Sequence, residues 1–161
     1  MKLRMMNIKE LKENPWIFSL AAGLFAILSL LTPSSTHGSS CPNPIQCCSG
    51  FCWQWGLEYG GGDFGWVWQP YLIVGLFTAA FFVVSGIIMI VTGLIARRRE
   101  EIRFGAAWST CGKIIIAQII LFIIYTLMRN YEYFEYHLVG FGLIGPFFSG
   151  AFAWIAGRLA R

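Results

Sequence analysis

Four long apolar segments alternate with polar ones along this chain, and their lengths predict four transmembrane helices. A helix rises about 1.5 Å per residue and the hydrocarbon core of a bilayer is about 30 Å thick, so about 20 apolar residues are needed to cross it. The apolar segments cover about residues 16–33, 70–96, 106–128 and 137–157. The polar segments between them are residues 34–69, 97–105 and 129–136. We therefore expect an all-α membrane protein, a four-transmembrane-helix bundle that forms one integral membrane domain.

The first apolar segment is the shortest, and two interpretations of it stay open. Its uninterrupted apolar run, residues 16–31, has about the length of a signal-peptide core, and Gly38 and Ser40 are small residues of the kind that precede a cleavage site. The polar stretch after the run is long for a signal peptide, which favours a retained helix. In both cases residues 34–69 lie outside the membrane.

The basic residues predict how the chain is oriented. Because Lys and Arg are retained on the cytoplasmic side, four crossings would place every basic stretch in the cytoplasm. We therefore expect a cell-membrane protein with both termini cytoplasmic. Ten of the twelve basic residues lie in three stretches beside the apolar segments: Lys2, Arg4, Lys9 and Lys12, then Arg97, Arg98, Arg99 and Arg103, then Arg158 and Arg161.

Composition agrees with a membrane protein. Hydrophobic residues make up 57% of the chain and charged residues 12%, whereas soluble domains carry about 25% charged residues. The net charge of +4 does not indicate a nucleic-acid partner, because the basic residues form no continuous patch with interleaved aromatic residues. Contact with the lipid bilayer, through anionic headgroups, explains them better.

The first outer loop, residues 34–69, contains four cysteines and no Lys or Arg. An even number of cysteines outside the cell predicts disulfides. A bridge between the adjacent Cys47 and Cys48 would be strained, which leaves two pairings: Cys41–Cys47 with Cys48–Cys52, or Cys41–Cys48 with Cys47–Cys52. The spacing lacks the C-x-x-C pairs of a zinc site, so we expect no metal and no cofactor.

Aromatic residues follow the cysteines in the same loop. Indole rings prefer the boundary between headgroups and hydrocarbon, so we expect interface anchors, with recognition of a partner as the alternative. The anchors are Trp53, Trp55, Trp66 and Trp68.

Four spans with both ends inside, a longer first outer loop with disulfides and a shorter second loop resemble the layout of claudin-like membrane proteins. Trp55, Gly56 and Leu57 are similar to the aromatic–glycine–leucine stretch that these proteins carry near their loop cysteines. This chain departs from that family, since its cysteines number four instead of two and precede Trp55 instead of following Leu57. The departure argues against an outer sheet of the claudin type.

Small residues recur at helical spacing in the second and fourth segments, where they predict close helix packing. The two seams are Gly75, Ala79, Gly86 and Gly93 in the second segment, and Gly145, Ser149, Ala153 and Gly157 in the fourth.

The third segment is the most polar one. Cys111, Gln118 and Tyr125 are seven residues apart, so they lie on one helix face, and an amide in hydrocarbon should turn inward. Lys113 points about 140° away from Gln118 at helical spacing. It either extends its side chain to the headgroups or lines a cavity.

These patterns contain no recognisable catalytic set, and no acidic residue lies in an apolar segment. We expect a non-enzymatic protein: a small structural or accessory subunit of a larger membrane complex, or a self-associating scaffold, with contacts to other membrane subunits or to itself through the seams and the Trp-rich loop. One alternative is a small channel or transporter with a polar path along the third helix. A second is an outer-face thiol-disulfide enzyme.

Overall fold

The helices of the computed structural model lie where the apolar segments predict them. The structure describes residues 13–37, 50–55, 57–60, 63–66, 71–99, 103–129 and 137–160. Two of the helices are long and apolar enough to cross a membrane, over Ile73–Arg99 and Gly105–Met128. The helices are α2 (Pro15–Leu31), α3 (Tyr71–Arg99), α4 (Gly105–Arg129) and α6 (Phe141–Leu159).

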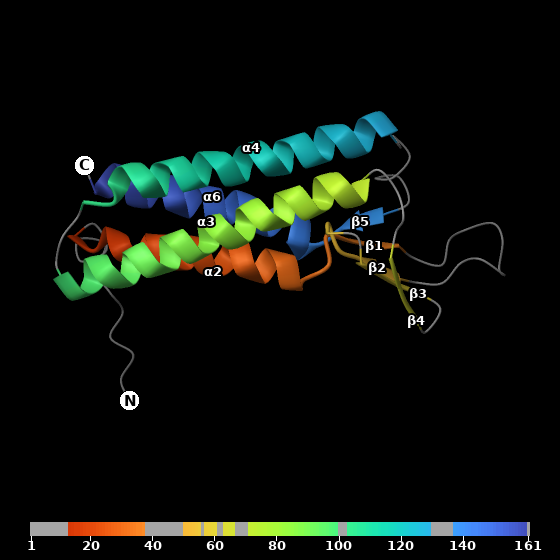
Figure 1. The fold of residues 1–161 in the computed structure, drawn as a ribbon, viewed down its shortest axis with the longest axis horizontal. Helices are drawn as coiled ribbons and strands as arrows, with labels where there is room; N and C mark the ends of the chain where they lie inside the picture. The colour runs from red at the N-terminus through yellow and green to blue at the C-terminus, as the bar shows by residue number, and fades with distance from the viewer. Residues whose placement is uncertain are drawn as a thin grey trace.

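These helices pack side by side as an antiparallel bundle (Figure 1). Helix α2 packs against α3 and α6, and α4 packs against the same two helices. Successive helices alternate in direction, so the start of α2, the end of α3, the start of α4 and the end of α6 lie at one end of the bundle. The strands lie at the opposite end, next to α2, α3 and α6.

Glycines allow α2 and α3 to approach closely. A Cβ atom on Gly23 would lie 2.7 Å from the carbonyl oxygen of Gly86, and one on Gly86 would lie 3.2 Å from the carbonyl oxygen of Gly23. Gly93, about two turns further along α3, lies against Leu20. The part of the α3 seam at Gly86 and Gly93 therefore packs on α2 of the same chain.

The seam on α6 is also used inside the bundle. Gly145 lies against Ser29 of α2, and the Ser149 hydroxyl donates a 2.7 Å hydrogen bond to the carbonyl of Ala22. Further along α6, a Cβ on Gly157 would lie 2.7 Å from the carbonyl oxygen of Gly105. One half of this seam thus packs on α2 and the other half on α4.

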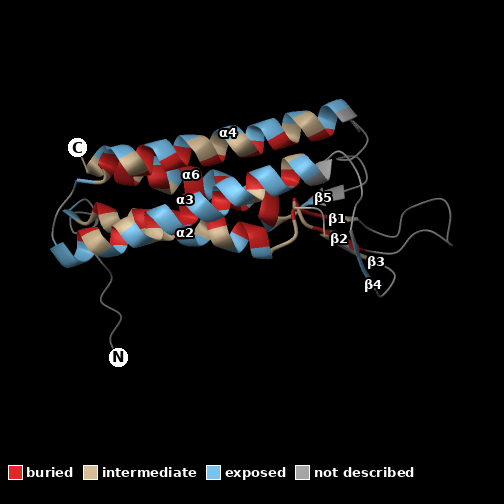
Figure 2. Cartoon of the chain, in the orientation of Figure 1, coloured by how far each residue is buried: buried red, intermediate tan, exposed pale blue. Residues whose placement is uncertain are grey.

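Large apolar side chains fill the space between the helices. Phe82, Met89, Trp108, Ile115 and Ile119 are fully buried, and buried positions form stripes on the inner faces of the helices (Figure 2). Helices that are apolar on all sides are typical of membranes. The outer faces of all four helices expose further apolar side chains, including Leu24, Leu28, Phe77, Val84, Ile87, Leu121, Ile124, Phe147 and Phe148.

A small antiparallel sheet covers the end of the bundle where α2 ends (Figure 1). Its order is β4-β3-β2-β1-β5. The prediction of a mostly helical chain is confirmed. The apolar pattern does not predict the five-stranded sheet, so the fold is not purely α-helical. The strands are β1 (Ser35–His37), β2 (Gly50–Cys52), β3 (Leu57–Gly60), β4 (Asp63–Trp66) and β5 (His137–Val139).

The last helix begins later than predicted, because residues 137–139 form strand β5. The apolar pattern predicted a helix from about residue 137, whereas His137–Val139 pair with β1 and α6 begins at Phe141. The sequence of these three residues is compatible with either a helix or a strand. Their pairing with a strand about a hundred residues earlier decides between them.

The close contact at Gly23 can be tested by a single methyl group. Gly23→Ala places a Cβ against the backbone of Gly86, and overpacking of this kind costs about 1–3 kcal/mol. We expect a correspondingly lower free energy of unfolding in detergent. Gly65→Ala is the matched control, because a Cβ there would meet no atom within 4 Å. Equal stability of the two variants would contradict the packing described.

Candidate functional site

A row of aromatic side chains crosses the outer sheet. Phe51 on β2 is paired with Tyr59 on β3, which is paired with Phe64 on β4. Directly paired residues in antiparallel strands project from the same face, and the ring centroids lie 6.5 Å apart for Phe51 and Tyr59 and 4.8 Å apart for Tyr59 and Phe64. Phe51 is 44% exposed and Phe64 is 67% exposed. We call Phe51, Tyr59 and Phe64 the aromatic row.

Two tryptophans join the aromatic row to the helices. The ring of Trp53 lies 6.4 Å from the rings of both Phe64 and Trp55. The indole N–H of Trp53 donates to the carbonyl of Leu31 at 3.1 Å, and that of Trp55 donates to the carbonyl of Leu30 at 2.8 Å. The last carbonyls of a helix have no partner within the helix. The two indoles therefore cap the end of α2.

Backbone contacts hold the sheet against the bundle at further points. The Ser34 N–H donates to the carbonyl of Cys52, and the Gly140 N–H donates to the carbonyl of Ser34, both at 2.8 Å. A Cβ on Gly75 of α3 would overlap the carbonyl of Gln54. The sheet is thus fixed to α2, to α3 and to the start of α6, so the aromatic row is carried on a firm support.

The structure describes some of the cysteines and tryptophans predicted for the first loop. Cys52 is buried in β2, whereas Cys41, Cys47 and Cys48 lie outside the described residues, so the pairing of the cysteines stays a prediction. Trp53 and Trp55 have a capping role beside their predicted anchoring. Trp66 is the last residue of β4, and Trp68 lies outside the described residues.

The residues of the predicted polar face of the third apolar segment differ in burial. Cys111 of α4 is buried and shares a hydrogen bond with Ser85 of α3. Gln118 and Tyr125 are half-buried, and Lys113 is exposed. A shared role for Cys111, Gln118 and Tyr125, and the choice between the two interpretations of Lys113, stay predictions.

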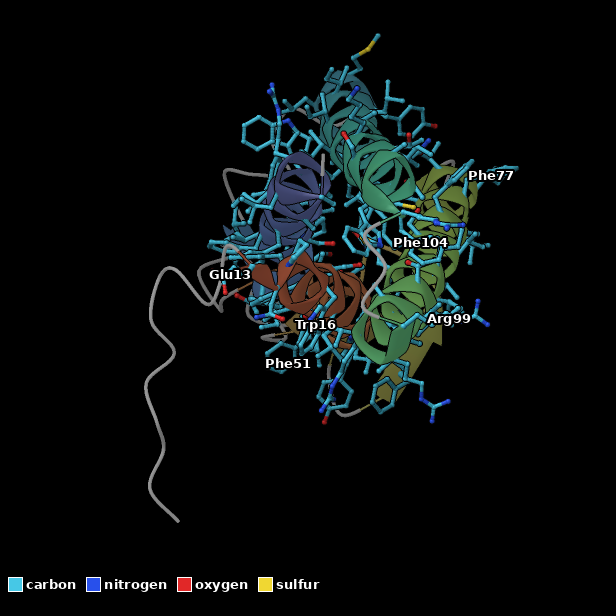
Figure 3. All side chains as sticks on the ribbon, turned by 90° about the vertical axis from the view of Figure 1, so that its left-hand side faces the viewer. Glu13, Trp16, Phe51, Phe77, Arg99 and Phe104 are labelled. Carbon is cyan, nitrogen blue, oxygen red and sulfur yellow. The ribbon has the colours of Figure 1, made fainter. Side chains whose placement is uncertain are left out.

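The end of the bundle opposite the sheet carries arginines, and Figure 3 looks onto this end. The guanidinium of Arg97 lies 5.3 Å from the centroid of the Trp16 ring, and that of Arg158 lies 5.1 Å from the Trp154 ring. Stacking of this type holds a cation against an aromatic face. The arginines described here are Arg97, Arg98 and Arg99 at the end of α3, Arg103 before α4 and Arg158 in α6.

Known relatives do not guide the interpretation of these sites. Neither protein-family models nor curated proteins match this chain. Among the described residues, no group of three or more His, Cys, Asp or Glu side chains could hold a metal ion. The aromatic row, with exposed rings on a sheet fixed to the helices, is the candidate site that geometry supports best.

The sequence contains a hairpin pattern from which part of the aromatic row could have been predicted. Leu57–Gly60 and Asp63–Trp66 flank a glycine-rich turn, which is typical of a hairpin. Tyr59 and Phe64 are placed opposite each other by that hairpin. Phe51 could be added only once β2 was known to pair with β3.

The cap on α2 can be tested with a conservative change. Trp55→Phe keeps an aromatic ring but leaves the Leu30 carbonyl without its donor, a loss of about 1–3 kcal/mol. We expect the free energy of unfolding in detergent to fall by that amount. The control is Trp154→Phe on the exposed face of α6, for which a change within about 0.5 kcal/mol is expected. An unchanged stability of Trp55→Phe would show that the indole does not cap the helix.

Proposed function

We propose that all four helices cross the membrane, with the arginine end in the cytoplasm and the sheet outside. Helices α2 and α6 have 17 and 19 residues and are about 26 and 28 Å long, close to the thickness of the hydrocarbon core. Their outer faces are apolar like those of α3 and α4. Five of the six described arginines lie at one end, which favours that end as the cytoplasmic one. The sixth, Arg129, ends α4 at the other end.

We further propose that the protein is a non-enzymatic structural or accessory subunit of a membrane complex, or a self-associating scaffold. The observation that carries this proposal is the exposure of Phe51 and Phe64 on a firmly attached sheet. Aromatic residues are enriched in protein interfaces and supply much of their binding energy. Exposed rings that are held in place lose little freedom on binding.

The aromatic row replaces the glycine seams as the proposed contact surface. Both seams lie against helices of the same chain, at Gly86 on α2 and at Gly157 on α4, for example. The seam glycines Gly86, Gly93, Gly145 and Gly157 are buried in these contacts. Contacts to other subunits are therefore assigned to the outer side.

Disulfides are proposed to complete the outer cap. Cys41, Cys47 and Cys48 belong to the segment between β1 and β2, and Cys52 is at the end of β2. Bridges among them would tie that segment to the sheet and add about 2–3 kcal/mol each. Peptide mapping of the unreduced protein distinguishes the two pairings, and free thiols at all four positions would refute both.

Substitution of the aromatic row tests the proposed function. We expect wild-type protein, extracted gently, to retain a companion subunit or a second copy in native mass spectrometry. The double variant Phe51→Ser/Phe64→Ser should lose at least about 90% of that complex, because truncated aromatic anchors cost about 2 kcal/mol or more.

Val139→Ser is the control for this experiment, because Val139 is an exposed apolar residue of the same sheet outside the aromatic row. It should leave the complex intact. A wild-type protein that is strictly monomeric with no companion would contradict the proposal. So would a double variant that keeps its complex.

A further inference from the structure

The arginine end of the bundle contains a pocket of about 330 Å³ between the start of α2, the end of α3 and the start of α4. Small-molecule sites begin at about 300 Å³, so the pocket suits a group of headgroup size. The lining side chains that matter for recognition are Glu13, Asn14, Trp16, Arg97 and Trp108. Figure 3 looks into this end, where Glu13 and Trp16 lie at the start of α2.

The aromatic walls of the pocket are held by hydrogen bonds at their polar edges. The indole N–H of Trp16 donates to Oδ1 of Asn14 at 3.0 Å, and that of Trp108 donates to the hydroxyl of Thr92 at 2.8 Å. Arg97 lies over the Trp16 ring at 5.3 Å. The pocket therefore combines fixed aromatic surfaces with one oriented cation.

The lining contains one residue of each charge, which restricts the ligand. Glu13 is exposed and precedes α2, and Arg97 is near the end of α3. The carboxylate of Glu13 would repel a purely anionic ligand, and the guanidinium of Arg97 would repel a simple cation. A molecule that carries a phosphate and an ammonium group a few bonds apart complements both.

We propose that this pocket binds the phosphoethanolamine headgroup of a phospholipid in the cytoplasmic leaflet, with the phosphate on Arg97 and the ammonium on Glu13. The assignment to a lipid rests on the proposed membrane orientation, which places this end at headgroup depth. Arginine matches phosphate oxygens with paired donors. A choline headgroup has no N–H to donate to Glu13, so ethanolamine is favoured over choline.

The test compares lipids retained by purified protein after reconstitution in vesicles with equal fractions of phosphatidylcholine, phosphatidylethanolamine and phosphatidylglycerol. Native mass spectrometry counts the lipids that remain bound. We expect wild-type protein to retain the ethanolamine lipid about three- to fivefold over each of the others, the range that an exposed charge pair supplies.

Two variants and a control separate the contributions of the two charges. Glu13→Gln should abolish the preference for ethanolamine over choline, and Arg97→Gln should lower retention of all three lipids. Arg98→Gln is the control, because it removes the same charge from a neighbour that does not line the pocket. Since Glu13 is exposed and outside α2, Glu13→Gln keeps the test valid even if Arg97→Gln disturbs the contact with Trp16.

Three results would overturn the proposal: a wild-type preference for phosphatidylglycerol, an ethanolamine preference that survives Glu13→Gln, or soluble O-phosphoethanolamine binding as tightly as the lipid does. Flotation of the vesicles scores membrane insertion separately. Protein that fails to insert contradicts the proposed function together with this inference. Protein that inserts without any lipid preference contradicts this inference alone.

Discussion

Hydrocarbon offers no hydrogen-bond partners, and in the proposed membrane setting the organisation of this protein depends on that constraint. Polar groups within the apolar segments must find partners inside the bundle. The Ser19 hydroxyl donates to the carbonyl of Met89 at 2.8 Å, and the Ser149 hydroxyl donates to that of Ala22 at 2.7 Å. Such bonds contribute about 0.6–2 kcal/mol each. They form because small residues let the backbones approach closely enough for a serine side chain to reach across.

In the proposed function, the same constraint leaves the two ends of the molecule for recognition. The seams are packed and side chains such as Phe82 and Trp108 fill the core. The proposed binding surfaces are therefore the sheet and the arginine end. The sheet is attached through the indole of Trp55 and through Gly75, so the end of α2 determines where the aromatic row lies. At the other end, Arg97 is oriented by the ring of Trp16. One chain thus combines a packed apolar middle with two chemically different surfaces.

The apolar runs predicted the positions of α2, α3, α4 and α6, apart from the start of α6, because a long apolar run is a local property of the sequence. The sheet could not be predicted in this way. Its strands have three or four residues, and Thr36 pairs with Leu138, a partner about a hundred residues away. Helical spacing likewise identified Gly86 as part of a packing face. It did not identify α2 as the helix packed against that face, because periodicity shows which residues share a face and not which element contacts them. The capping role of Trp55 depends on where α2 ends, which only the folded chain shows.

The central claim is that the sheet and the arginine end lie on opposite sides of a membrane, and epitope accessibility tests it most directly. One tag is inserted in the turn between Gly60 and Asp63 of the β3–β4 hairpin, and a second is added after Arg161. The account predicts that antibody reaches the first tag on intact cells and the second only after the membrane is permeabilised. Detection of both tags on the same side would contradict it.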